Sequence, residues 1–119
     1  MSRTMKLPNA EQATIAPEKV RDYLLSPTHP GGRFKAEFFA ALGYTREDWR
    51  QLEADLRSQH VSLDADAAAP TEHGQKFTIT GPLIGPSGKR AGAISVWIID
   101  RGESIPRLVT VYPARRARR

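Results

Sequence analysis

The amino-acid sequence predicts an α+β fold in which three N-terminal helices pack on a C-terminal antiparallel sheet of three to four strands. Apolar side chains recur at helical spacing between residues 17 and 58, and at a period of two from residue 77 onward. Helices followed by a meander of strands are typical of helices packed on one face of a sheet. We therefore expect an irregular lead-in over 1–16, a single α+β domain over 17–113 and a basic tail over 114–119.

The first predicted helix begins at Pro17, because proline suits the first helical position. Its apolar positions are Val20, Tyr23 and Leu24. Pro27 follows, and the residue before a proline is driven out of the helical region, so we expect this helix to end by Ser26.

Two further helices are predicted after a short loop. The second carries an apolar stripe and ends at Gly43, since glycine is the usual C-terminal stop. The third begins with Thr45 as N-cap and Asp48 three residues later, a variant of the capping box, and continues to about Ser58. The stripe residues are Phe34, Phe38, Ala41 and Leu42 in the second helix and Trp49, Leu52 and Leu56 in the third.

The sheet is predicted from the second half of the chain. Residues 64–71 are expected to form a loop, and Phe77 and Ile79 mark the first strand. Gly81-Pro82 signals a bend and Pro86-Ser87-Gly88 a turn. In the run 91–100 both the odd-numbered and the even-numbered positions carry apolar side chains. This predicts a central strand whose two faces are both covered by the protein, or one whose second face is covered by a partner. The last strand spans 106–112.

Composition and charge narrow the class of protein. The chain lacks cysteine, which excludes disulfides and thiolate metal sites. No apolar run approaches the roughly 18 residues of a membrane span, so we expect no membrane partner and a cytoplasmic protein. The net charge of +5 falls to +1 without the last four arginines, so the body is nearly neutral. That tail is expected either to add phosphate affinity or to be a solvated end.

Motifs for metals and nucleotide cofactors are absent from the sequence. His29, His60 and His73 are widely spaced and lack the pairing of a zinc helix. The chain contains neither a P-loop nor a dinucleotide-binding glycine pattern. We therefore expect no metal ion and no cofactor.

The stretch 26–43 holds the first candidate site. Two cations, Arg33 and Lys35, lie where a helix begins, and there they oppose the helix macrodipole. Gly32 allows the backbone to approach a ligand closely, and His29 lies nearby. These residues supply positive charge and backbone N–H groups, which can together hold a phosphate. The alternative is a tight interhelical turn with solvated cations.

The strands supply further candidates. Thr110 and Tyr112 are predicted to share one face of the last strand with Leu108, beside Ser95 and Trp97 of the central strand. Trp97 then either stacks on a base or belongs to the core. Together these side chains are expected to form a polar, aromatic-lined cleft. Lys76 precedes the first strand's apolar pair and is either solvated or directed at this cleft.

Five blocks of sequence resemble a bacterial domain family of unknown function, whose members stand alone or form C-terminal domains of polymorphic toxins. The blocks are KLPNAE (6–11), YLLSPTHPGGRFKAEFFAALGYT (23–45), GPLIGPSGK (81–89), VWII (96–99) and RLVTVYP (107–113). The order of elements and the blocks HPxGxxKAxFF and VTxYP are in turn similar to the barnase–EndoU–colicin–RelE-like RNase toxins.

This second resemblance implies a barnase/RelE-like fold and metal-independent RNA cleavage, in which the ribose 2′-hydroxyl attacks the adjacent phosphate. His29 would be the acid or base and Lys35 the cation on the phosphate, assisted by Arg33. Thr110 and Tyr112 would orient the phosphate or share proton transfer. The implied partners are RNA and an acidic neutralising protein.

Two alternatives remain. The first is a non-catalytic protein-binding module, or the partner component of a toxin–antitoxin-type two-gene system, which would use the surface of Trp97 and Tyr112. The second is a binder of a phosphate-bearing small molecule. An enzyme needs His29 and Lys35 to converge on one point, whereas a binding module tolerates them apart.

Overall fold

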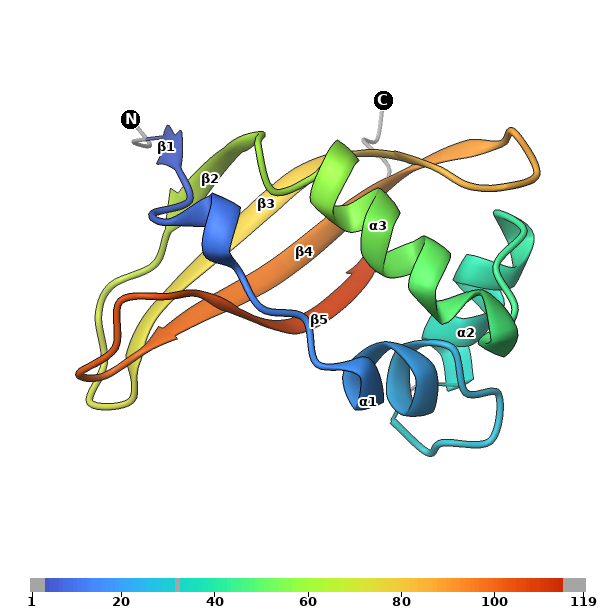
Figure 1. Cartoon of the computed structure of the whole chain (residues 1–119), viewed down its shortest axis with the longest axis horizontal. Coiled ribbons are helices and arrows are strands. Elements are labelled where there is room, and N and C mark those ends of the chain that lie inside the picture. The colour runs from blue at the N-terminus through green and yellow to red at the C-terminus, as the bar shows by residue number, and fades with distance from the viewer. Residues whose placement is uncertain (1–3, 32, 115–119) are drawn as a thin grey trace, which may run out of the picture.

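The computed structural model describes residues 4–31 and 33–114 of the chain. It is an α+β fold with a five-stranded antiparallel sheet of order β1-β2-β3-β4-β5 and three α-helices (Figure 1). The strands are β1 (Thr4–Lys6), β2 (Asp64–Ala67), β3 (Gly74–Ile84), β4 (Arg90–Asp100) and β5 (Arg107–Pro113). The helices are α1 (Pro17–Lys19), α2 (Arg33–Ala41) and α3 (Trp49–Gln59), joined by the shorter turns η1 (Ala10–Gln12), η2 (Val20–Leu24, π-helical) and η3 (Arg46–Asp48).

The local signals for helix ends are confirmed. Pro17 opens α1, which continues into η2. Gly43, with φ 102°, follows α2 in the conformation that favours glycine. The backbone N–H of Thr45 donates to Asp48 Oδ2 at 2.8 Å, so the predicted capping interaction precedes α3.

The predicted arrangement of the sheet needs three corrections. The helices are not all N-terminal, because β1 precedes them and pairs with β2. Residues 64–67 are a strand rather than a loop, since Ala65 is buried between β1 and β3 and the pairing partners complete the backbone hydrogen bonds. Finally, β3 passes through Gly81-Pro82 without ending. The sheet has five strands instead of three to four because β1 and β2 extend it beyond β3.

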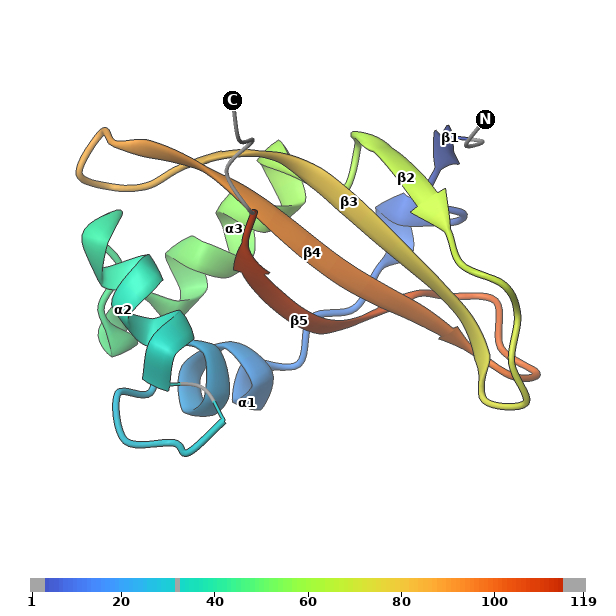
Figure 2. The ribbon, with the colours of Figure 1, turned by 180° about the vertical axis from the view of Figure 1, so that it is seen from behind.

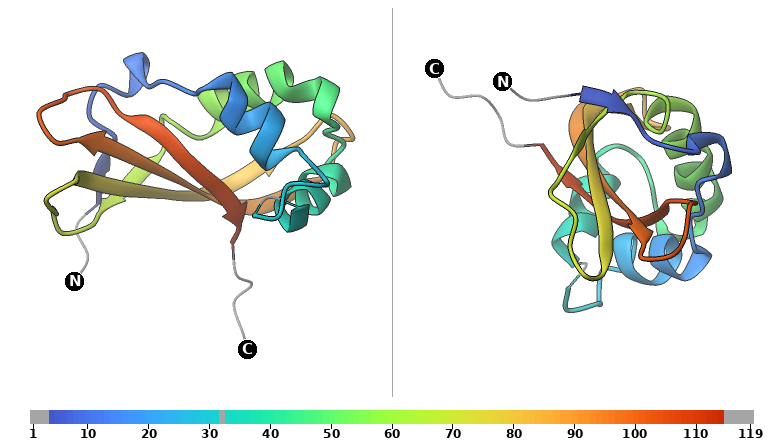
Figure 3. Two further views of the ribbon diagram at one scale, coloured as in Figure 1. Left: turned by 90° about the horizontal axis from the view of Figure 1, so that it is seen from below. Right: turned by 90° about the vertical axis from the view of Figure 1, so that its left-hand side faces the viewer.

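The core lies between the helices and one face of the sheet. Figure 3 shows α1 and α3 on this inner face and α2 beyond the end of β5, while Figure 2 looks onto the outer face, where no helix covers β3 and β4. The strands contribute a continuous layer of buried side chains to the inner face: Phe77, Ile79, Leu83, Ala93, Ser95, Trp97, Leu108 and Val111. Against them pack Val20, Leu24, Phe39, Leu52 and Leu56 from the helices.

A β-bulge in β5 changes which of its residues share a face. Trp97 pairs with Leu108 and Val96 pairs with Thr110, which leaves Val109 as the extra residue. Leu108 and Val111 are both buried, while Tyr112 is exposed. Thr110 and Tyr112 therefore share the face opposite Trp97, and the prediction that Leu108 shares their face is wrong.

A buried chain of hydrogen bonds joins the end of α3 to the middle of the sheet. His60 and Ser95 are fully buried, and His60 Nδ1 lies 2.8 Å from Ser95 Oγ. Trp97 Nε1–H donates to the same Oγ at 2.9 Å, and His60 Nε2 lies 3.2 Å from the Gly81 carbonyl oxygen. Both ring contacts are satisfied when Nε2 carries the proton and donates to Gly81, and Nδ1 accepts from Ser95.

The side chain of Gln59 occupies the edge of β3 that no strand covers. Its Oε1 accepts from the Ile84 N–H at 2.8 Å, and its Nε2 donates to the Ile84 carbonyl at 3.0 Å. These are the two bonds that a neighbouring strand would form. The amide thus satisfies the edge of β3 where β2 no longer pairs with it.

The N-terminal segment is tied to the last strand. Thr14 forms a parallel bridge with Arg107: its N–H donates to Pro106 O at 2.9 Å, and its carbonyl accepts from Leu108 N–H at 3.0 Å. Ala13 and Ile15 beside it are buried in the core.

The Ser95 hydroxyl can be tested by the variant Ser95→Ala. Removing it leaves the Trp97 indole N–H and His60 Nδ1 buried without partners, and such groups cost about 1–3 kcal/mol each. We expect the free energy of unfolding, measured by urea denaturation, to fall by about 2–4 kcal/mol. Ser58→Ala, which changes an exposed hydroxyl on α3, is the control. A change in Ser95→Ala as small as that of the control would show that the network does not stabilise the fold.

The burial of His60 predicts a dependence of stability on pH. Burial lowers its pKa from the ordinary value of 6.5, so the native protein holds a neutral ring. The unfolded chain takes up a proton as the pH falls below 6.5, while the native ring does not. Stability is therefore full above this value and falls below it, by up to about 1.4 kcal/mol per pH unit, until the native-state pKa is reached.

Urea unfolding at about pH 7.5 and about pH 5.5 measures this loss. The control variant is His60→Gln, because a glutamine amide can donate to Gly81 but does not titrate. We expect the wild type to lose more stability than the variant between the two conditions. Equal losses would assign the pH dependence to other groups.

Candidate functional site

Tyr23, on η2, is the centre of a group of polar and cationic side chains that we call the Tyr23 cluster. It consists of Lys19, Tyr23, His29, Lys35 and Thr110, which come from α1, η2, the following loop, α2 and β5. The Nζ atoms of Lys19 and Lys35 each lie 5.5 Å from the centre of the Tyr23 ring. Both cations are within the range of cation–π attraction to this ring.

His29 packs edge-on against Tyr23, with 5.1 Å between the ring centres. Its Nδ1 accepts a hydrogen bond from the Gly31 N–H at 2.9 Å. The neutral ring therefore carries its proton on Nε2 and offers an N–H donor. In this conformation the lone pair that a general base needs is occupied by Gly31.

The loop before α2 is held close to the cluster by Gly31. Its carbonyl accepts from Lys35 Nζ at 3.5 Å. A Cβ atom at Gly31 would lie 3.4 Å from the His29 ring and 3.5 Å from the Tyr23 ring, so the backbone itself packs against both rings. Lys35 is thereby placed beside Tyr23 and His29.

The Thr110 hydroxyl makes the phenol of Tyr23 more acidic. Its interaction with Tyr23 is the largest cause that lowers the pKa of Tyr23, and the charges of Lys35 and Lys19 lower it further, against the opposing effect of burial. Thr110 Oγ1 is buried and forms no hydrogen bond of normal geometry with the described residues. It is therefore free to donate when Tyr23 ionises, and such a bond favours the phenolate.

The structure brings together three of the residues predicted from the sequence and leaves others apart. His29, Lys35 and Thr110 meet at Tyr23. Tyr112, two residues after Thr110, is 36% exposed on the outer face. Lys76 lies on β3, two strands away from β5, and lines a different pocket with His73, Asp100 and Arg107.

The prediction that Trp97 stacks on a base is wrong. Its side chain is 0% exposed, and its indole N–H is bonded to Ser95 in the core. The proposed cleft of Ser95, Trp97, Thr110 and Tyr112 does not form, because the β5 bulge places the two pairs on opposite faces. Gly32 and the side chain of Arg33 lie outside the described residues, as do the arginines of the tail.

Tyr23 and Lys19 are the members that sequence reasoning missed, since Tyr23 was assigned to the apolar stripe of the first helix. One signal was available. A tyrosine at a half-buried helical position needs a partner for its hydroxyl. Lys19, four residues earlier, lies on the same helical face.

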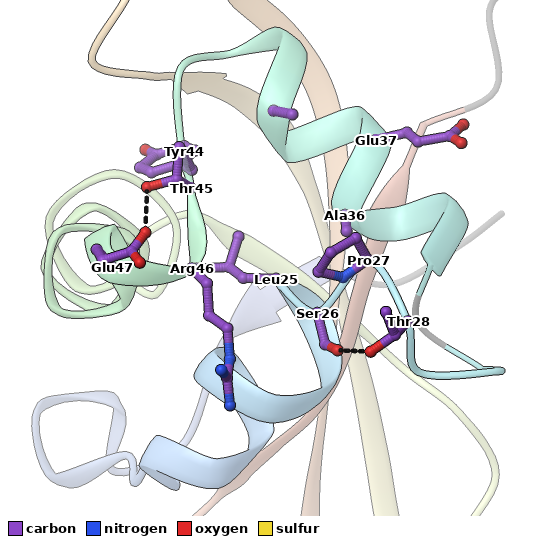
Figure 4. A pocket seen from close by; sticks show the side chains of 11 residues that line it. Leu25, Ser26, Pro27, Thr28, Ala36, Glu37, Tyr44, Thr45, Arg46 and Glu47 are labelled. Atoms are coloured by element: carbon purple, nitrogen blue, oxygen red, sulfur yellow. Dashed lines mark hydrogen bonds between the residues drawn. The ribbon is translucent and has the colours of Figure 1, made fainter.

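A second concave site lies on the other side of the loop that carries His29. This pocket, which we call the Ser26 pocket, has a volume of about 620 Å³ and lies between the loop 25–28, α2 and the residues 44–47 (Figure 4). Leu25, Ala36 and Tyr44 are apolar and buried, while polar side chains surround them at the surface. The other lining residues are Ser26, which is polar and buried, and the exposed residues Pro27, Thr28, Glu37, Ala40, Thr45, Arg46 and Glu47.

Metal and membrane sites were also sought. Within residues 4–31 and 33–114, no three His, Asp or Glu side chains are grouped so that they could hold a metal ion. Among the described helices, none combines the length and the apolar character that a membrane span requires.

Comparison with known proteins places the domain in a family. A family described as a domain of unknown function, DUF6883, matches residues 6–115, which is nearly the whole chain. The chain belongs to the DUF6883 family. No curated protein and no solved structure matches this DUF6883 domain. The Tyr23 cluster and the Ser26 pocket both lie within the matched residues.

The acidity of Tyr23 in this DUF6883 domain can be measured directly. In Thr110→Val the hydroxyl that stabilises the phenolate is replaced by a methyl group of similar size, so we expect the pKa of Tyr23 to rise toward its ordinary value of 10.0. Tyrosine labelled with ¹³C at the ring Cζ, followed by NMR across a pH titration, reports each tyrosine separately. Tyr23→Phe assigns the signal. An unchanged pKa of Tyr23 in Thr110→Val would show that the Thr110 hydroxyl does not stabilise the phenolate.

Proposed function

We propose that this domain cleaves RNA without a metal ion, and that the Tyr23 cluster is its active site. The observation that carries the proposal is a phenol of lowered pKa between two lysines and a histidine N–H donor. A base, hydrogen-bond donors and fixed positive charge are what attack by a ribose 2′-hydroxyl requires.

Binding of the phosphate is the first step. Lys19 and Lys35 lie on one aromatic ring, and neither forms an ion pair with a described carboxylate. Both ammonium groups are therefore available to an anion that binds beside the ring. The His29 Nε2–H supplies a directed hydrogen bond to a phosphate oxygen, which is a donor role in place of the acid–base role expected from the sequence.

Tyr23 is suited to act as the base. Its phenolate accepts the proton of the 2′-hydroxyl as the 2′-oxygen attacks the phosphorus and the new P–O bond forms. The bond from phosphorus to the 5′-oxygen breaks, and the leaving oxygen takes a proton from the ammonium of Lys35. The products are a 2′,3′-cyclic phosphate and a free 5′-hydroxyl, with the lysines offsetting the charge that develops on the phosphate.

The resemblance to RNase toxins also supports metal-independent RNA cleavage. It links the blocks that contain His29, Lys35 and Thr110 to a class of enzymes that cleave RNA without a metal. An acidic neutralising protein that covers the cationic Tyr23 cluster would be the partner of such a toxin.

A non-catalytic binding module is the second candidate, favoured by the outer face of the sheet. Ile94 and Val96 of β4 lie on that face, half-buried and without a helix over them (Figure 2). Tyr112 lies beside Ile94 in the register of β4 and β5. An apolar strip of this kind suits a protein partner.

Cleavage of a single-stranded RNA in the presence of EDTA tests the proposal. We expect the wild type to produce 2′,3′-cyclic phosphate ends. Tyr23→Phe should lower the rate by about 10²–10⁴, the contribution typical of a general base. Lys35→Ala should lower it by at least about tenfold, because both the general acid and a positive charge beside the phosphate are lost. The matched control is Lys89→Ala, an exposed lysine of the β3–β4 turn.

Two results would contradict RNA cleavage at this cluster. Intact RNA after long incubation with abundant wild-type protein would leave the binding module as the function. Cleavage that persists unchanged in Tyr23→Phe would place the active site elsewhere. Circular dichroism of each variant shows that the fold is kept.

A further inference from the structure

The Ser26 pocket differs from the rest of the molecule in the sign of its charge. The chain carries a net charge of +5, yet two glutamates line this pocket. Figure 4 shows Glu47 beside Thr45, and Glu37 extending from α2 away from the other lining side chains. Glu37 forms no ion pair with the described side chains. Among residues 4–31 and 33–114, Glu47 accepts a hydrogen bond only from the Thr45 hydroxyl, at 3.2 Å. These carboxylates would repel a phosphate, so the pocket is no part of an RNA site.

The cation that lines the pocket is paired with a carboxylate outside the pocket. Arg46 Nη2 donates to Asp22 Oδ1 at 2.7 Å, and its Nε donates to the Arg21 carbonyl at 3.3 Å. Arg21 binds the same Asp22, so this carboxylate is shared by two guanidinium groups. Figure 4 shows the Arg46 guanidinium directed toward η2 and away from Thr45. Two carboxylates and one guanidinium line the pocket, so the sum of the lining charges is negative.

A buried hydroxyl gives the pocket a second polar feature. Ser26 is only 9% exposed, and among the described residues its hydroxyl contacts only that of Thr28, at the long distance of 3.4 Å (Figure 4). Buried hydroxyls in folded proteins ordinarily have a well-formed hydrogen bond. Ser26 and Thr28 thus retain acceptor capacity toward the pocket, next to the apolar floor of Leu25 and Tyr44.

We propose that the Ser26 pocket binds an arginine side chain from a segment of a partner protein. A volume of about 620 Å³ is within the usual range for binding sites and exceeds what one side chain needs, so the neighbouring residues of the segment enter as well. The apolar stem of the arginine covers Leu25, and its guanidinium, which is planar and rich in donors, pairs with a glutamate and the hydroxyl oxygens.

This inference does not depend on RNA cleavage. The two sites are nevertheless neighbours, since the loop that lines the pocket with Ser26 and Thr28 continues directly to His29. Likewise α2 presents Ala36 to the pocket and Lys35 to Tyr23. A partner seated in the pocket would lie against the elements that position the Tyr23 cluster.

Amide chemical shifts of ¹⁵N-labelled protein, titrated with acetyl-leucyl-arginine amide, test the proposal. We expect saturable shifts confined to the residues that line the pocket, and a much weaker response to acetyl-leucyl-glutamate amide. The double variant Glu37→Gln with Glu47→Gln should raise the dissociation constant by about tenfold or more, as the loss of a charge-assisted hydrogen bond predicts.

The matched control is Glu11→Gln with Glu103→Gln, which removes the same charge from two exposed glutamates of η1 and the β4–β5 turn. It should bind the arginine peptide as the wild type does. Equal responses to the arginine and glutamate peptides, shifts outside the pocket, or equal affinity of the two double variants would each overturn the proposal. Thermal unfolding of all variants verifies that the fold is intact.

Discussion

The position of α3 on the sheet depends on the buried hydroxyl of Ser95. Apolar contacts are not directional, whereas hydrogen bonds fix the position of the groups that they join. The bonds between Ser95 and His60 and between His60 and Gly81 therefore hold the end of α3 in one register on the sheet. Gln59, one residue earlier, is aligned with Ile84 by the same placement. At the opposite end of the helix, Arg46 binds Asp22, which adjoins Tyr23. The hydrogen bonds in the core thus fix one end of α3, and the bond between Arg46 and Asp22 joins its other end to η2, which carries Tyr23.

Charge is separated over a short distance in this domain. One side of the segment 25–31 presents His29 to the two lysines on Tyr23, and the other side presents hydroxyls and glutamates to the Ser26 pocket. The body is nearly neutral in sum, so its net charge conceals this polarity. Local fields of opposite sign on the two sides of one loop suit ligands of opposite charge, and such fields act over about 8–10 Å at physiological salt. The positive tail is therefore a poor guide to where an anion binds.

The features that the sequence predicted well are local ones. Pro17, Gly43 and the pair Thr45–Asp48 mark helix ends because each acts on backbone groups a few residues away. Strands β1 and β2 were missed because their pairing joins residues far apart in the chain, and aspartate and alanine are poor strand formers. The face of Thr110 was misassigned because a bulge at Val109 leaves no mark in an alternating sequence. His29 and Lys35 were singled out because they lie where a helix begins, whereas Tyr23 was missed because it was assigned to an apolar stripe and Thr110, which acts on it, comes from the last strand.

The bridge between Thr14 and Arg107 has a consequence for synthesis of the chain. The segment that carries Ala13 and Ile15 is synthesised long before its backbone partners on β5. At about 5–20 residues per second, the nascent chain exposes these apolar side chains for several seconds before the bridge can close. The helices can form within that time, but the core stays open until β5 has been made. The fold of this domain is therefore completed only when β5 emerges, and until then its N-terminal half exposes apolar surface to which chaperones bind.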